Sequence, residues 1–144
     1  MLVQHILSGK QGGVETITSD ASVNEATKVL SRRKIGALIV SDDEGKSIRG
    51  ILSERDIVRE VGARGAAALS DSVMDIMTAK VQSCKTDDNA VEVLARMTSG
   101  RFRHMPVLDG EALIGVVSIG DVVKARLGEV ENENSALADM IRGY

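Results

Sequence analysis

Hydrophobic and polar positions follow the same order twice along the chain. A β-branched segment comes first, then apolar residues at helical spacing, then two apolar runs separated by turn residues, and finally a second helix. In the first repeat these segments are 14–18, 23–30, 37–40, 42–45, 48–52 and the helix from Glu54. In the second repeat they are 81–85, 90–97, 105–108, 109–110, 113–117 and the helix from Ile119. Because strands and helices differ in hydrophobic period, each repeat is predicted to be a β-α-β-β-α unit.

The alignment of the two repeats extends beyond their elements. An offset of 67 positions places Val14 on Val81, and after a shorter loop an offset of 65 places the segment 50–56 on 115–121. The lead-in segments also match, Val3-x-x-Ile6-Leu7 with Val73-x-x-Ile76-Met77. Two repeats, and no more, predict a pseudo-symmetric pair rather than a solenoid.

The repeats divide the chain into three parts. We expect the first repeat to span 1–66, the second to span 67–128, and a C-terminal tail to span 129–144. The segment 62–68 is expected to join the repeats. The tail is polar at first, and Leu137, Met140 and Ile141 then predict a short helix.

A Gly-x-x-Ser-x-x-Asp motif follows the third strand of each repeat, as 50–56 and 115–121, and the second strand of the second repeat begins Arg103-His-Met-Pro-Val107. With these motifs, the doubled unit resembles the cystathionine-beta-synthase (CBS) domain family over residues 1–127, as a paired Bateman module. The resemblance implies an α+β fold (an α/β sandwich) with two pseudo-symmetric motifs, short sheets and flanking helices.

The resemblance also implies a function. CBS pairs are regulatory modules rather than enzymes, and they bind AMP, ADP, ATP, NAD(H) or S-adenosylmethionine in two clefts between the motifs. A disk-like homodimer that signals to an unknown effector protein is therefore expected. The alternatives are a structural interaction protein that binds no nucleotide and a nucleic-acid binder.

By the same resemblance, each cleft takes a Ser/Asp pair from one repeat and its base-side wall from the other. The first cleft would be lined by Thr16, Ala21, Ile35, Gly36, Ala37, Arg103, His104, Val116, Ser118, Gly120 and Asp121. The second would be lined by Ile51, Ser53, Arg55, Asp56, Ser83, Asp88, Phe102 and Arg103. Thr16 and the small Ala21 match the family pattern, whereas in the second cleft Asp88 replaces a small residue and Phe102 a smaller aliphatic one. The first cleft is therefore the preferred nucleotide site.

The chemistry of these residues suits a nucleotide. A helix N-terminus beside a serine attracts a phosphate, an aspartate can accept hydrogen bonds from ribose hydroxyls, and the Arg103 guanidinium suits phosphate oxygens. The Ser/Asp pairs are equally ordinary helix caps, and the two roles are compatible. Phe102 could stack on a base or fill the core. Gly50 and Gly115 could admit a ligand close to the backbone or form simple bulges.

Composition narrows the function classes. The 144 residues are 43% hydrophobic and 27% charged with a net charge of −3, which is typical of a globular domain. No segment reaches the ~18 apolar residues of a membrane helix, and no secretory signal is evident. A single cysteine, Cys84, fits a reducing cytoplasm.

The same composition argues against two kinds of partner. No basic surplus is present, and Phe102 and Tyr144 are the only aromatic residues, so a nucleic-acid partner is not expected. We find no nucleophile–base pair and no metal-ligand spacing, and therefore expect neither an enzyme, nor a catalytic cofactor, nor a metal.

Overall fold

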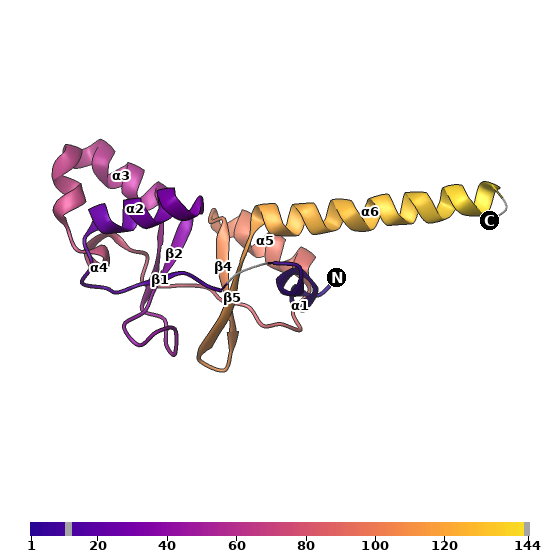
Figure 1. The fold of residues 1–144 in the computed structure, drawn as a ribbon, viewed down its shortest axis with the longest axis horizontal. Helices are drawn as coiled ribbons and strands as arrows, with labels where there is room; N and C mark the ends of the chain where they lie inside the picture. Colours follow the sequence, from indigo (N-terminus) through magenta and orange to yellow (C-terminus); the bar gives the residue numbers. More distant parts are fainter. Residues whose placement is uncertain (11–12, 143–144) are drawn as a thin grey trace.

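The computed structural model describes residues 1–10 and 13–142, so Tyr144 lies outside the described residues. The first half contains α1 (Val3–Ser8), β1 (Thr16–Ile17), α2 (Val23–Arg33), β2 (Ala37–Val40), β3 (Gly50–Ser53) and α3 (Glu54–Arg64). A 3-10 helix (Gly65–Ser70) and α4 (Val73–Ile76) lead to α5 (Ala90–Gly100), β4 (His104–Asp109), β5 (Ala112–Ser118) and α6 (Ile119–Arg142). The predicted mixed α/β fold with short sheets and flanking helices is confirmed (Figure 1).

Local sequence signals set the helix boundaries. The Ser22 hydroxyl accepts a hydrogen bond from the Glu25 amide at 3.0 Å at the start of α2. The Asn89 side chain accepts one from the Val91 amide at 2.8 Å at the start of α5. Such caps satisfy amides that have no partner within the helix. Each helix is followed by a residue in the left-handed backbone conformation, Lys34 after α2 and Arg101 after α5. This residue turns the chain toward the next strand.

The strands form two small sheets. β1 pairs with β2 in parallel and β2 pairs with β3 in antiparallel, whereas β4 and β5 form an antiparallel pair. The predicted first strand of the second repeat is wrong in extent, because Cys84 alone bridges to Val107. The chain turns immediately afterwards, since the Lys85 amide donates to the Asp88 carboxylate at 2.9 Å.

The segment 62–68, expected to join the repeats, is helical: α3 runs through Gly62 to Arg64, and a 3-10 helix follows. One further expectation from the sequence is wrong. The tail does not form a separate short helix, because α6 continues without a break from Ile119 to Arg142. No proline interrupts this segment, and residues such as Glu131 and Glu133 are good helix formers.

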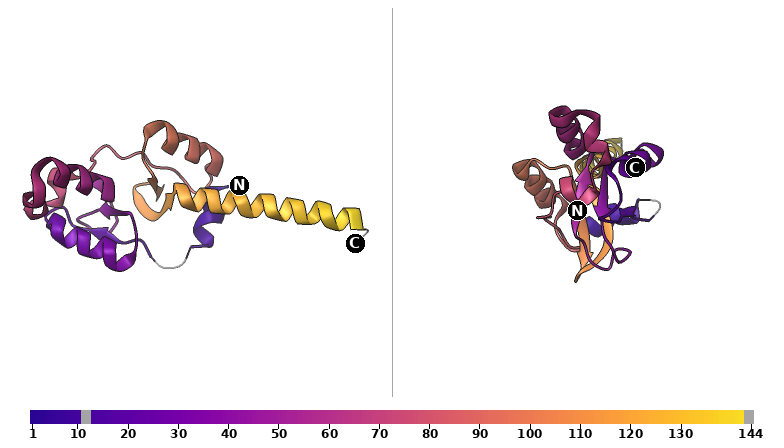
Figure 2. Two further views of the ribbon diagram at one scale, coloured as in Figure 1. Left: turned by 90° about the horizontal axis from the view of Figure 1, so that it is seen from above. Right: turned by 90° about the vertical axis from the view of Figure 1, so that its left-hand side faces the viewer.

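The lead-in helices are exchanged between the two cores. One core contains strands and helices of the first repeat together with α4, and its buried residues are Val23, Ala26, Leu30, Leu38, Val40, Leu52, Ile57, Val73 and Ile76. The other contains elements of the second repeat together with α1, and its buried residues are Val3, Ile6, Cys84, Ala90, Val93, Met97, Met105, Val107, Val117 and Val122. Each lead-in helix therefore packs on the opposite repeat, and the repeats lie side by side (Figure 2).

Gly50 and Gly115 lie where these lead-in segments press against the sheets. A Cβ at Gly50 would lie 2.7 Å from the Thr78 carbonyl oxygen, and one at Gly115 would lie 2.6 Å from a Leu7 methyl group. The close approach at both glycines thus comes from the protein itself, from the exchanged segment, and not from a ligand.

Candidate functional site

Exchange of the lead-in helices forces two segments to cross between the repeats. The chain leaves α1 on the second repeat and enters β1 on the first, and it leaves α4 on the first repeat and reaches Cys84 on the second. Each crossing segment forms one wall of a cleft. Lys10, Gly13, Val14 and Glu15 line one cleft, and Thr78, Lys80, Val81 and Gln82 line the other.

The first cleft has a volume of about 710 Å³. Its walls come from the crossing segment, from the turn between α2 and β2, and from the end of β5 with the first turn of α6. Predicted residues in this lining are Ile35, Gly36, Ala37, His104, Val116, Ser118 and Asp121. The cleft therefore brings the Ser/Asp pair of the second repeat opposite the α2–β2 turn of the first.

Asp121 is the best-placed acceptor in the first cleft. Its carboxylate accepts hydrogen bonds from the Lys10 ammonium at 2.8 Å and the Ser118 amide at 2.9 Å. Burial raises the pKa of the Asp121 carboxyl, but these partners outweigh burial and hold the pKa below its ordinary value. Lys10 also donates to the Val116 carbonyl at 2.9 Å and so connects the crossing segment to β5.

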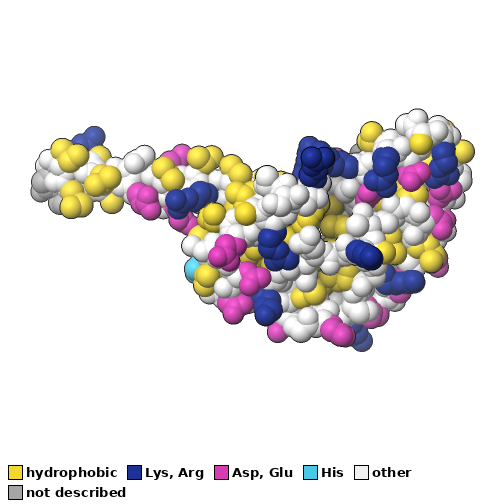
Figure 3. Space-filling model, turned by 180° about the vertical axis from the view of Figure 1, so that it is seen from behind, with side chains coloured by type: hydrophobic (Ala, Val, Ile, Leu, Met, Phe, Trp, Pro, Cys, Tyr) yellow, Lys and Arg dark blue, Asp and Glu magenta, His cyan; other side chains and the backbone are white. Residues whose placement is uncertain are grey.

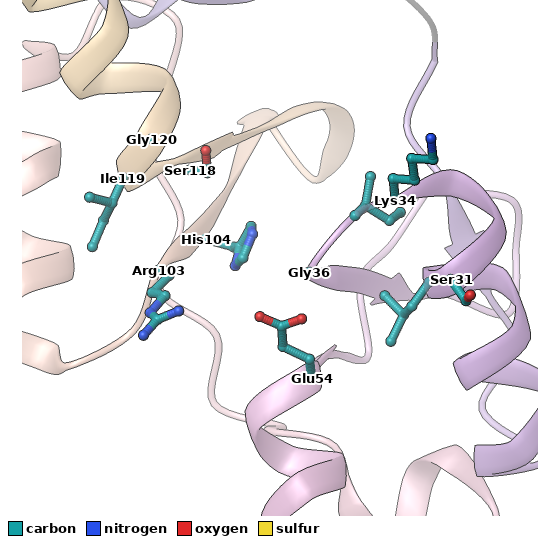
Figure 4. Close-up of a pocket in the computed structure, with 11 residues that line it drawn as sticks. Ser31, Lys34, Gly36, Glu54, Arg103, His104, Ser118, Ile119 and Gly120 are labelled. Carbon is teal, nitrogen blue, oxygen red and sulfur yellow. The ribbon is translucent and has the colours of Figure 1, made fainter.

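A central cavity of about 740 Å³ lies between the two repeats (Figure 4). It shares Lys34, Ile35, Gly36, His104 and Ser118 with the first cleft. Its lining also contains the predicted residues Arg103 and Gly120. Arg103 lines this cavity and the second cleft rather than the first cleft, and Figure 4 shows its side chain directed away from Ser118 and Gly120.

His104 stands at the centre of the site. Figure 4 shows its ring between Ser118 of the second repeat and Gly36 of the first, with the Glu54 carboxylate directed into the same space. A Cβ at Gly36 would lie 3.2 Å from the imidazole Cε1 atom, so glycine allows the ring to approach β2 closely. Burial lowers the pKa of His104, against the opposing effects of Asp121 and Glu54.

The lowered pKa of His104 predicts a stability change with pH. The unfolded chain takes up a proton at this imidazole near pH 6.5, whereas the folded protein resists it, so the unfolded state binds more protons below that pH. The free energy of unfolding should therefore fall between about pH 7.5 and about pH 5.5. His104→Gln should reduce this fall in urea titrations, with His5→Gln at an exposed histidine as the matched control. An equal fall in the His104→Gln variant would contradict the assignment.

The second cleft is smaller, about 450 Å³, and more basic. Predicted residues in its lining are Ile51, Ser53, Arg55, Asp56, Phe102 and Arg103. Arg59, Lys80 and Arg101 add three cations, and Glu54 adds one acid. In the alignment of the repeats, Arg55 corresponds to Gly120 and Arg103 corresponds to Gly36. The second cleft therefore has positive charges at two positions where the other repeat has glycine.

Asp56 and Phe102, two predicted residues of the second cleft, also contact the rest of the protein. Asp56 is 5% exposed, and its carboxylate accepts hydrogen bonds from the Ser53 amide at 3.0 Å and from Arg59 at 3.1 Å. Phe102 packs against the core of the second repeat while its ring borders the cleft. It therefore fills the core and still presents an edge to the cavity.

Both Ser/Asp pairs form helix caps. The Asp56 amide donates to the Ser53 hydroxyl at 3.2 Å, and the Asp121 amide donates to the Ser118 hydroxyl at 3.0 Å. Each carboxylate in turn accepts a hydrogen bond from the backbone amide of its serine. The pairs thus satisfy backbone amides at the two helix N-termini.

Four predicted residues lie outside the lining of these cavities. Thr16 pairs with Ile39 from the edge strand β1, and Ala21 packs against the core of the first repeat. Their counterparts Ser83 and Asp88 also lie outside, with the Ser83 carbonyl accepting a hydrogen bond from Arg96 and the Asp88 carboxylate held by the Lys85 amide. The crossing segments take their place, because the walls are set by the exchange of α1 and α4.

One feature of the sequence points to the residues of the crossing segments, namely the alignment of the two repeats. The offset of 67 pairs Val14 with Val81 and Glu15 with Gln82, and both members of each pair line a cleft. Within residues 1–10 and 13–142, no group of three or more His, Cys, Asp or Glu side chains is arranged to hold a metal ion.

The fold and site define a pseudo-symmetric two-repeat module with ligand-sized clefts between the repeats. The family model of the CBS domain matches residues 12–63 and 73–128, and the chain belongs to the CBS domain family. A CBS domain-containing mitochondrial protein, CBSX3 of Arabidopsis thaliana, is 36% identical over 129 residues. That match covers 88% of this chain but 63% of the relative, so the chain spans less than two thirds of that protein.

Similar solved structures show the same architecture. The CBS-domain containing protein ATU1752 from Agrobacterium tumefaciens is 43% identical with a TM-score of 0.83, and the match covers 88% of this chain and 99% of that one. The CBS domain pair of MJ0100, solved in complex with 5'-methylthioadenosine and S-adenosyl-L-methionine, is 25% identical with a TM-score of 0.76, over 90% of this chain and 98% of that one. The predicted resemblance to CBS domain pairs is therefore confirmed.

Proposed function

We propose that this chain is a regulatory module that binds an adenine nucleotide in the first cleft. The observation that carries the proposal is Asp121, a half-buried carboxylate that ends a cleft of about 710 Å³ and faces the α2–β2 turn. A carboxylate in such a place accepts hydrogen bonds from ribose hydroxyls. The MJ0100 complex supports the choice of ligand, because both of its ligands contain adenosine.

The central cavity is suited to the phosphate. It continues from the first cleft through Lys34, His104 and Ser118, and it ends at Gly120 in the first turn of α6. The amides of a helix N-terminus attract anions, and Arg103 adds a forked donor. AMP would thus place adenosine in the first cleft and phosphate in the central cavity.

The more basic second cleft favours a ligand with more phosphates. Five cations against two acids line it, which suits the higher negative charge of ADP or ATP. NAD(H) would need both an adenosine site and space for a second nucleotide. S-adenosylmethionine, whose sulfonium is positive, suits the second cleft least.

The downstream action is part of the same proposal. Ligand binding would stabilise one relative orientation of the repeats, since His104, Gly36 and Glu54 meet between them, and an effector protein would bind that orientation.

We expect a non-catalytic module in a reducing cytoplasm. No helix in the described part of the chain has the length and apolar character to cross a membrane.

A thermal unfolding scan with AMP tests the nucleotide proposal. Ligand at ~100 times its dissociation constant adds about 2.7 kcal/mol, which raises the Tm by several degrees for a domain of this size. GMP is the control, because it carries the same ribose and phosphate on a different base. No stabilisation by AMP, ADP, ATP, NADH or S-adenosylmethionine would favour an interaction protein that binds no nucleotide. A gel shift at physiological salt would test nucleic-acid binding.

A further inference from the structure

The C-terminal half of α6 projects beyond both repeats (Figures 1 and 2). Its counterpart α3 has 11 residues, whereas α6 has 24. The match to the CBS family ends at residue 128, so the last turns of α6 are an addition to the family unit. A few helical turns without packing are marginally stable in water, and these turns therefore need a partner surface.

Most of the exposed apolar residues of α6 form a heptad seam. The exposed large hydrophobic residues in this seam are Val123, Leu127, Val130, Leu137 and Ile141, and Met140 flanks it. Their spacings alternate between four and three once Asn134 is included between Val130 and Leu137. This spacing places Val123, Val130 and Leu137 at d positions and Leu127, Asn134 and Ile141 at a positions of a coiled coil.

The seam faces away from the repeats. The residues that α6 turns toward the rest of the chain begin with Val122, which is 0% exposed, whereas Val123 is 42% and Leu127 57% exposed. At 100° per residue, Val122, Ala125 and Glu129 lie on one side of the helix and the seam lies on another. Hydrophobic side chains recur along the projecting helix in Figure 3, so a partner can reach them.

We propose that α6 forms a parallel two-stranded coiled coil with α6 of a second molecule of this chain. The polar residue in the seam, Asn134, selects this arrangement. In a parallel pair, a positions face each other, and two Asn134 amides can hydrogen-bond across the seam. In an antiparallel pair, Asn134 would face an apolar d residue and leave its amide buried without a partner, which is costly.

The flanking charges fit the same partner. In a parallel pair, each g residue lies beside the e residue five positions further along the other helix. Arg126 would then meet Glu131 of the second molecule, and Glu133 would meet Ala138. Opposite charges face each other in the first pair and no like charges face each other in the second, so nothing opposes the parallel register.

Engineered cysteines test the geometry directly. In the parallel coil, Asn134→Cys places two thiols across the seam at disulfide distance, whereas Asn132→Cys at an f position points away from it. The native thiol does not interfere, because Cys84 is buried and burial raises its pKa to about 11. Under mild oxidation, Asn134→Cys should form covalent dimers at least about tenfold faster than Asn132→Cys. Equal rates would overturn the parallel arrangement.

Charged substitutions test the association itself. Sedimentation of the full chain over a concentration series should show a dimer for the wild type and for Ala136→Glu, a control outside the seam. Leu137→Glu should raise the dissociation constant of the dimer and lower the helical signal of the last turns of α6. The melting temperature of the repeats should stay unchanged, because Leu137 lies outside both cores. A monomeric wild type, or a dimer whose dissociation constant Leu137→Glu leaves unchanged, would overturn the proposal. Neither measurement contains nucleotide, so both are independent of the proposed ligand.

Discussion

Gly50→Ala is expected to destabilise the protein by about 1–3 kcal/mol, the usual cost of overpacking a well-filled site. The new methyl carbon would lie 2.7 Å from both the Thr78 carbonyl oxygen and the Met77 sulfur. The carbonyl cannot withdraw easily, because it accepts the Ile51 amide at 2.9 Å while the Thr78 amide donates to the Ile51 carbonyl at 2.9 Å. Urea unfolding monitored by circular dichroism measures the change as a lower midpoint at an unchanged slope.

Two other glycines provide a graded series for this prediction. Gly115→Ala meets a Leu7 methyl group, the far end of a flexible side chain, and should cost less than Gly50→Ala. Gly62→Ala in α3 meets nothing within 4 Å and should stabilise the protein by about 0.5–1 kcal/mol. If Gly50→Ala were as stable as Gly62→Ala, the packing of the exchanged segment against β3 would be wrong.

The sequence predicted what depends on local pattern. The starts of α2 and α5 follow from Ser22 and Asn89, whose caps lie within three residues of their amide partners. The helices from Glu54 and Ile119 were expected at the positions where they begin. These helices are determined locally, by capping residues and by the spacing of hydrophobic residues, and both can be recognised in a single sequence.

The exchange of the lead-in helices could not be predicted in the same way. Val3 and Val73 occupy equivalent positions in their repeats, and the sequence pattern is the same whether each packs on its own repeat or on the other. The choice depends on the path of the intervening chain, which is a tertiary property. The sequence pattern therefore does not indicate the walls built by the crossing segments at Val14 and Val81, and Thr16 and Ser83 lie outside the lining of the described cavities.

The first strand of the second repeat shows a related limit. The segment from Val81 has the same apolar pattern as the segment from Val14, yet it provides a single bridge residue, Cys84. The chain turns after this position in both repeats, since the Asp88 amide donates to the Lys85 carbonyl and the Ala21 amide donates to the Thr18 carbonyl, each at 3.2 Å. In the second repeat the Asp88 carboxylate also accepts the Lys85 amide, and the aligned Ala21 has no carboxylate for such a bond. β-propensity alone does not predict whether a backbone amide bonds to a nearby side chain or to the neighbouring strand.

Asp121→Ala is expected to weaken AMP binding by at least about 1 kcal/mol, roughly fivefold or more in Kd, if its carboxylate accepts the ribose hydroxyls. Asp56→Ala, the equivalent change in the second cleft, should leave this binding step unchanged, because Asp56 lies in the other cleft. Isothermal titration calorimetry measures both. Asp121→Asn keeps an acceptor for the Ser118 amide and so controls for loss of the helix cap.

A ligand lacking one hydroxyl separates a ribose contact from an indirect effect. The wild type should bind 2'-deoxy-AMP more weakly than AMP, because the Asp121 carboxylate then has one donor fewer. The Asp121→Ala variant should bind the two ligands with similar affinity, since the acceptor that distinguishes them is gone. A variant that still discriminates between them as strongly as the wild type would move the ribose away from Asp121. An unchanged Kd for AMP in Asp121→Ala would remove the first cleft as the nucleotide site, even where the thermal scan shows binding.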